Sequence, residues 1–117
     1  MRVAGFGFRK AAGIDSLRAA LALTGGDVAA LASVEGKVAG LAGLAEELGL
    51  PVIGVSVQEM AELDLAGSAR VKRLYGTGSV AEAAAMVAAG RGARLVVAKI
   101  TSPDGMAVAA IAEGPGR

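Results

Sequence analysis

The sequence predicts an α/β protein, built as a single three-layer α/β/α sandwich with a mixed, mostly parallel sheet and a C-terminal antiparallel hairpin. Short apolar runs alternate with helix-spaced segments through residue 90, which is the pattern of parallel strands joined by right-handed crossover helices. A Ser-Pro-Asp-Gly turn at 102–105 then separates two further apolar runs, as in a β-hairpin. A length of 117 residues suits one domain, and we expect residues 1–117 to form it.

The first half of the chain is expected to hold three strands and two helices. The strands are the apolar runs 2–8, 28–33 and 51–56. The first helix runs to Thr24, and Asp15 and Ser16 are residue types that cap helices at the N-terminus. The second helix covers 37–48, where apolar residues recur at helical spacing, and Gly49 is well placed to end it.

The second half begins with a capping box. Ser56 is followed three residues later by Glu59, which predicts the start of a short helix that ends near Leu65. The segment 70–76 fits either a strand or an extended loop. The remaining elements are an alanine-rich helix over 79–90 and the two hairpin strands over 94–100 and 106–112.

The composition excludes several classes of site. The chain has no cysteine and no histidine, which excludes zinc sites made from these residues, Ser-His-Asp and Cys-His triads, and histidine acid–base chemistry. We therefore expect no metal and no cofactor. A net charge of +1 and an aromatic content of 3% give no basis for a nucleic-acid partner.

The sequence shows neither a signal peptide nor an unbroken apolar run of membrane-spanning length. The chain enters the apolar strand 2–8 at once, and its longer apolar stretches are interrupted by charges or glycines. Together with the absence of cysteine, this predicts a cytoplasmic protein with no membrane partner.

The first candidate site is Gly-Phe-Gly-Phe-Arg-Lys, at the carboxyl end of the first predicted strand, where ligands of open α/β sheets bind. Gly5 and Gly7 would let a ligand approach the backbone. Arg9 can bind a carboxylate through two hydrogen bonds, and Lys10 adds a second cation. A dinucleotide fingerprint would need glycine where Lys10 stands. An anion site and a tight strand exit with two solvated cations both remain open.

The second candidate site is Gly-Thr-Gly-Ser, before the alanine-rich helix. The free N–H groups and the positive dipole end of a helix N-terminus attract anions, and Gly76 and Gly78 would allow close approach. Ser79 and Glu82 also fit a capping box, in which each side chain bonds the backbone N–H of the other residue. We expect Glu82 to be a capping residue first, which is compatible with an anion bound nearby.

The third candidate is Lys37, which follows the second predicted strand and so belongs to the same edge of the sheet as Arg9. A lone lysine at this place can equally be a solvated residue. The prediction is that Gly5–Lys10, Lys37 and Gly76–Ser79 form one ligand face.

These segments, in this order, resemble the CobE/CbiG C-terminal family of cobalamin biosynthesis, and the chain is most similar to its free-standing CobE type. The resemblance covers nearly the whole chain, and its most specific motif is glycine followed by Ser-Val-Ala-Glu-Ala-Ala-Ala. The matching segments are GFGFRKAAG, ASVEGK, GLPVIGVSVQEM, GTGSVAEAAAMVAAG, VVAKI and AVAAIA.

The resemblance implies a role in making the corrin ring. In CbiG-type proteins this domain follows an N-terminal part, and the whole opens a δ-lactone on cobalt-precorrin-5A and releases acetaldehyde. The free-standing CobE type implies instead binding or delivery of a precorrin or corrinoid intermediate, with other enzymes of the pathway as further partners. The family's motif residues fall on Gly5, Gly7, Arg9, Lys37, Gly76, Gly78, Ser79 and Glu82.

The chain departs from the family pattern at three places. Phe8 stands where many relatives have cysteine, Val38-Ala39-Gly40 lacks an acidic residue, and Val108 replaces a threonine. These losses favour a non-catalytic binding protein over the lactone-opening hydrolase, whose general base would have to be Glu82, Glu35 or a lysine with a lowered pKa. A phosphate- or nucleotide-binding module is the third interpretation.

Overall fold

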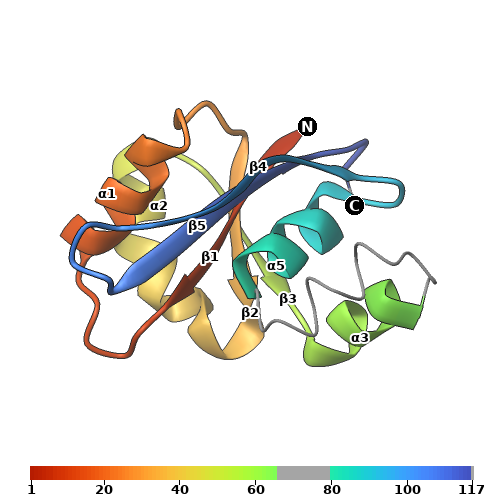
Figure 1. The fold of residues 1–117 in the computed structure, drawn as a ribbon, viewed down its shortest axis with the longest axis horizontal. Helices are drawn as coiled ribbons and strands as arrows, with labels where there is room; N and C mark the ends of the chain where they lie inside the picture. Colours follow the sequence, from red (N-terminus) through yellow and green to blue (C-terminus); the bar gives the residue numbers. More distant parts are fainter. Residues whose placement is uncertain (66–79, 117) are drawn as a thin grey trace.

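The computed structural model of the protein describes residues 1–65 and 80–116 (Figure 1). The elements of these two ranges are β1 (Arg2–Phe8), α1 (Ile14–Leu23), β2 (Ala30–Val34), the 3₁₀ helix η1 (Glu35–Leu41), α2 (Ala42–Leu48), β3 (Val52–Val55), α3 (Val57–Leu65), α5 (Val80–Ala89), β4 (Arg94–Thr101) and β5 (Ala107–Glu113).

The strands form one five-stranded sheet in the order β3-β2-β1-β5-β4. The pairs β1–β2 and β2–β3 are parallel, whereas β5 is antiparallel to both of its neighbours, β1 and β4. It follows that β4 has the same direction as β1, β2 and β3, and only β5 runs against them. The predicted mixed, mostly parallel sheet with a C-terminal antiparallel hairpin is confirmed.

Helices cover both faces of the sheet, which confirms the three-layer sandwich (Figure 1). One core lies between the sheet and helices α1 and α2, and it is built around Phe6, Leu17 and Leu44. The other core lies under α3 and α5, where Val3 and Met60 pack against the alanines of α5. Successive β1 residues alternate between the two cores, as the two-residue period of a strand requires.

The alanine-rich sequence of α5 has a structural reason in the contact of this helix with β1. A Cβ atom on Gly5 would overlap the carbonyl oxygen of Ala81 and would lie 2.6 Å from the backbone nitrogen of Ala85. The backbone of α5 therefore lies directly on β1, at a distance that glycine at position 5 permits and that a larger residue there would not. This core is thin and closely packed, with little area buried by each side chain.

The predicted helix starts in the first half of the chain need correction. Helix α1 is preceded by Gly13 as its N-cap, which makes no side-chain capping bond, so neither Asp15 nor Ser16 caps it. The segment predicted as a helix over 37–48 begins as the 3₁₀ helix η1 and becomes α-helical only in α2. The glycines Gly36 and Gly40 are poor α-helix formers, which explains this start.

Two other helix signals are confirmed. Gly49 ends α2 in a left-handed conformation, with φ of 68°. In the capping box before α3, the N–H of Glu59 donates to Ser56 Oγ, and the N–H of Ser56 donates to Glu59 Oε1, both at 3.0 Å. The predicted segment 70–76 lies outside the described residues.

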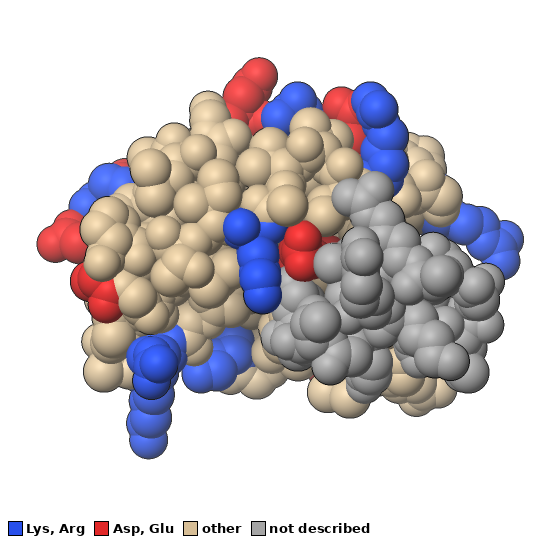
Figure 2. Space-filling view, viewed as in Figure 1, with Lys and Arg blue, Asp and Glu red and all other residues tan. Residues whose placement is uncertain are grey.

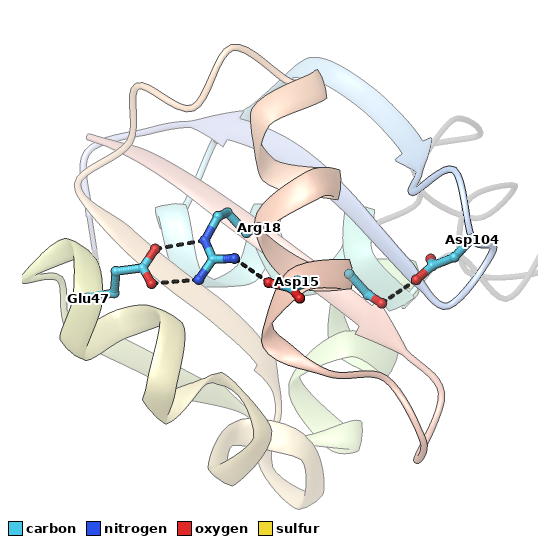
Figure 3. Close-up of polar contacts among 5 residues, drawn as sticks. Asp15, Arg18, Glu47 and Asp104 are labelled. Atoms are coloured by element: carbon cyan, nitrogen blue, oxygen red, sulfur yellow. Dashed lines mark hydrogen bonds and ion pairs between the residues drawn. The ribbon is translucent and has the colours of Figure 1, made fainter.

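Polar contacts tie α1 to its neighbours (Figure 3). Arg18 donates to both carboxylate oxygens of Glu47 on α2, at 2.9 and 2.7 Å, and to Asp15 at 2.5 Å. Asp104, in the turn between β4 and β5, accepts hydrogen bonds from Ser16 and Ser102, each at 2.5 Å. Asp15 and Ser16 thus bind other side chains, Arg18 and Asp104, and do not cap α1.

Candidate functional site

The carboxyl end of β1 leads into a tight, hydrogen-bonded turn. The N–H of Arg9 donates to the carbonyl oxygen of Met106, and the carbonyl oxygen of Arg9 accepts from the N–H of Ala12, both at 2.9 Å. The side chains of Arg9 and Lys10 are exposed. The backbone is thus fixed by the hairpin while two cations face solvent at the end of the strand.

The first turn of α5 lies beside this end of β1. A Cβ atom built on Gly7 would lie 3.8 Å from the backbone nitrogen of Ala81 and 3.9 Å from Cβ of Val80. The positive dipole end of α5 therefore adjoins the carboxyl end of β1. A ligand face shared by the end of β1 and the start of the alanine-rich helix requires these two elements to be neighbours, and they are.

Lys37, on η1 directly after the second strand β2, reaches the same place. Its Nζ lies 5.3 Å from the centroid of the Phe8 ring, within the range of a cation–π contact. The Phe8 ring also packs on Gly40, where a Cβ atom would come within 2.6 Å of the ring. Lys37 thus lies against the residue next to Arg9, and the two cations belong to one edge of the sheet.

Gly5 has a role other than the one the sequence indicates. Its missing side chain makes room for the backbone of α5 rather than leaving open space. A part for Gly5 in ligand binding therefore stays a prediction, whereas its part in helix packing is evident from the contact.

Glu82 is buried at the start of α5, with a relative exposure of 4%. Its Oε2 accepts a hydrogen bond of 3.3 Å from the N–H of Lys99 on β4. The register between β4 and β5 shifts between Val97 and Ile100, which takes this N–H out of the regular ladder. Glu82 therefore joins the helix to an irregular edge strand, a contact that the sequence pattern did not reveal.

Three predicted site residues cannot be placed in this geometry. Gly76, Gly78 and Ser79 lie outside the described residues, and so does the predicted bond between Ser79 and Glu82. Glu35, the other carboxylate considered as a base, is exposed at the start of η1.

Charged side chains are dispersed over the face of the molecule shown in Figure 2, which is mostly tan with scattered blue and red. Within the part of the chain that the structure describes, no group of three or more acidic side chains could hold a metal ion. Over the same residues, no helix is long and apolar enough to cross a bilayer.

Fold and sheet edge together define a small α/β/α domain with cations at the carboxyl ends of its parallel strands. Its sequence matches the family described as cobalamin synthesis G C-terminus over residues 2–112, so the chain belongs to that family. The family predicted from the sequence motifs is thereby confirmed. A search of curated proteins found no match.

Solved structures agree with this assignment. CobE, a protein from the cobalamin (vitamin B12) biosynthetic pathway, is 33% identical with a TM-score of 0.77, over 100% of this chain and 92% of that one. The cobalamin biosynthesis protein chiG from Agrobacterium tumefaciens str. C58 is 32% identical with a TM-score of 0.73, over 98% and 99% of the two chains.

A third structure shares the fold alone. It is a putative cobalamin biosynthesis protein G homolog from Sulfolobus solfataricus, with 20% identity and a TM-score of 0.73 over 99% of this chain. The match covers only 37% of that longer chain.

Proposed function

We propose that the protein acts in cobalamin biosynthesis by binding or delivering a polycarboxylate precorrin or corrinoid intermediate. The binding site is the side of the sheet where the parallel strands β1 and β2 end, with Arg9, Lys10 and Lys37, which we call the carboxyl edge. The observation that carries the proposal is the meeting of Lys37 with the end of β1, next to the exposed Arg9 and Lys10. In a chain of this family, such a cationic edge suits the acetate and propionate arms of a corrin precursor.

The chemistry of the edge fits carboxylates well. Arg9 presents a planar guanidinium that can hold a carboxylate through two parallel hydrogen bonds, while a lysine provides a compact charge with three donors. Arms spread around a macrocycle can reach separate cations. The first turn of α5 adds a positive dipole end to the same edge. Carboxylates and phosphates share these features, and the family membership favours the polycarboxylate.

The contacts of Glu82 favour a structural role for this residue over a role as general base. Its carboxylate is buried and accepts a backbone hydrogen bond, so it already stabilises the contact between α5 and β4. A general base must reach the proton it abstracts from a bound substrate. Lactone opening with acetaldehyde release, with Glu82 as the general base, is the alternative function, and an acetaldehyde-release assay distinguishes the two.

Affinity for purified precorrin intermediates tests the proposal, with absorbance and mass measured for whatever co-purifies. We expect Arg9→Ala to weaken binding by about 1.5–3 kcal/mol, as for a charged hydrogen bond. Arg91→Ala is the matched control. This exposed arginine precedes β4, which runs in the same direction as β1, so it lies where the parallel strands begin and not where they end. Equal losses in the two variants would indicate diffuse attraction and contradict a site at the carboxyl edge.

A further inference from the structure

Phe8 makes two contacts that bear on Lys37. One is the cation–π contact, with Lys37 Nζ 5.3 Å from the ring centroid. The other is with Gly40, whose missing side chain leaves the space that the ring occupies. Lys37 and Gly40 both belong to η1, so the ring at the end of β1 packs on this short helix at two points.

The absence of a side chain at Gly40 gives the Phe8 ring room to lie against η1, and the ring is also packed against the hydrophobic core between the sheet and α1 and α2. Any side chain at this position would come within 2.6 Å of the ring, so glycine is required for the ring to lie this close to η1. Phe8 is half-buried, whereas the next residue, Arg9, is exposed. Because the core holds one side of the Phe8 ring, the ring offers a packed surface to Lys37, whose four-carbon stem would otherwise sample many rotamers.

A held lysine binds an anion at lower entropic cost than a free one. Ordering a rotamer-rich side chain at an interface costs free energy that reduces affinity, and a side chain ordered beforehand avoids this cost. The aromatic ring attracts the ammonium through its negative face and leaves N–H donors on the other side for a ligand.

We propose that Phe8 is a positioning residue, which holds the Lys37 ammonium at the carboxyl edge of the sheet in readiness for one carboxylate arm of a tetrapyrrole ligand. The inference rests on the proposed function, because it deepens the description of the same site. It assigns to Phe8 a role through Lys37, without contact between the ring and the ligand.

A double-mutant cycle tests this role, with uroporphyrin as the probe, since it is a tetrapyrrole with a carboxylate on every side chain. We expect Phe8→Leu to weaken binding about three- to tenfold, which corresponds to the cost of ordering one long side chain. In a Lys37→Met background the same Phe8→Leu change should have no further effect. Replacement of Phe8 by pentafluorophenylalanine, which keeps the ring but inverts its quadrupole, should weaken binding like Phe8→Leu.

The outcomes separate the two proposals. If wild-type protein binds uroporphyrin and Phe8→Leu has the same effect with and without Lys37, the positioning role is wrong and the proposed function stands. If the pentafluoro variant binds like wild type, the cation–π contact has no part in binding, and the positioning role is again wrong. If wild type binds neither uroporphyrin nor precorrin intermediates, the proposed function fails, and the role of Phe8 fails with it.

Discussion

Single residues decide how α5 is attached to the sheet, and Glu82 is the most informative of them. Replacement by glutamine keeps an oxygen that can accept from the N–H of Lys99, whereas alanine removes it. We expect Glu82→Gln to leave stability nearly unchanged and Glu82→Ala to lower the free energy of unfolding by about 1–2 kcal/mol. Chemical denaturation followed by circular dichroism measures both.

The same pair of variants tests for catalysis. If Glu82 were a general base, Glu82→Gln would fold and bind an intermediate but release no acetaldehyde from a lactone substrate, although wild type releases it. That result would contradict the binding role. The structural role predicts instead that binding survives in Glu82→Gln.

Gly5 is a second decisive residue. A methyl group at this position would meet the backbone of Ala81 and Ala85, and backbone atoms cannot move aside as the end of a long side chain can. We expect Gly5→Ala to destabilise the protein by about 1–3 kcal/mol through overpacking. Gly36→Ala is the control, because nothing lies within 4 Å of its added methyl group, and it should change stability by less than about 0.5 kcal/mol. Equal melting temperatures for the two variants would contradict the close contact.

At the scale of elements, Asp104 joins the β4–β5 hairpin to α1. Hydrogen bonds from Ser102 and Ser16, and from the N–H of Met106, hold the pKa of Asp104 below its ordinary value. The carboxylate is thus favoured in the folded state, so its contribution to stability is present above the unfolded pKa of about 3.9. That contribution is lost as pH falls through the lower folded pKa.

Asp104→Ala tests this contribution. The difference in unfolding free energy between wild type and Asp104→Ala should be constant above about pH 5 and should shrink as pH falls below about 4. Urea denaturation at a series of pH values measures it. A difference that grows toward low pH would mean that the carboxylate is disfavoured in the fold. Other acidic groups with lowered pKa values, such as Glu113, are common to both proteins and cancel.

The capping box of α3 gives a further prediction for an element. Ser56→Ala removes the acceptor for the N–H of Glu59, and we expect a loss of about 1 kcal/mol, as for other N-cap serines. Ser33→Ala serves for comparison, because Ser33 is fully buried and its hydroxyl donates to the carbonyl oxygen of Phe6 at 2.8 Å, away from α3. Both should destabilise, but amide exchange should increase across α3 only in Ser56→Ala.

For the whole molecule, sequence patterns predicted the order and layers of the elements better than the side-chain contacts between them. Strand–helix alternation and the turn at 102–105 predicted the layers and the hairpin, because both depend on local periodicity and turn chemistry. The contacts of Asp104 with Ser16 and of Glu82 with Lys99 join segments far apart in the chain. No local pattern encodes such pairs.

The candidate site divides in the same way. Placing Arg9 and Lys37 at one edge of the sheet needed only the rule for carboxyl ends of parallel strands. The contacts of the Phe8 ring with Lys37 and Gly40 could not be predicted, because they join the end of β1 to η1, a segment about thirty residues further along the chain. At Gly5 the sequence allowed a ligand, whereas the fold places a helix there.

Binding of a polycarboxylate tetrapyrrole at the carboxyl edge of the sheet is tested most directly by a map of amide chemical shifts. Isotope-labelled protein would be titrated with purified precorrin intermediates while its amide resonances are followed by NMR. We predict that the largest changes fall at the end of β1 and the start of η1, from Gly7 to Lys10 and from Glu35 to Lys37. Changes centred instead on the opposite edge, around Arg91 and Arg94, would contradict the claim, as would a spectrum that no intermediate alters.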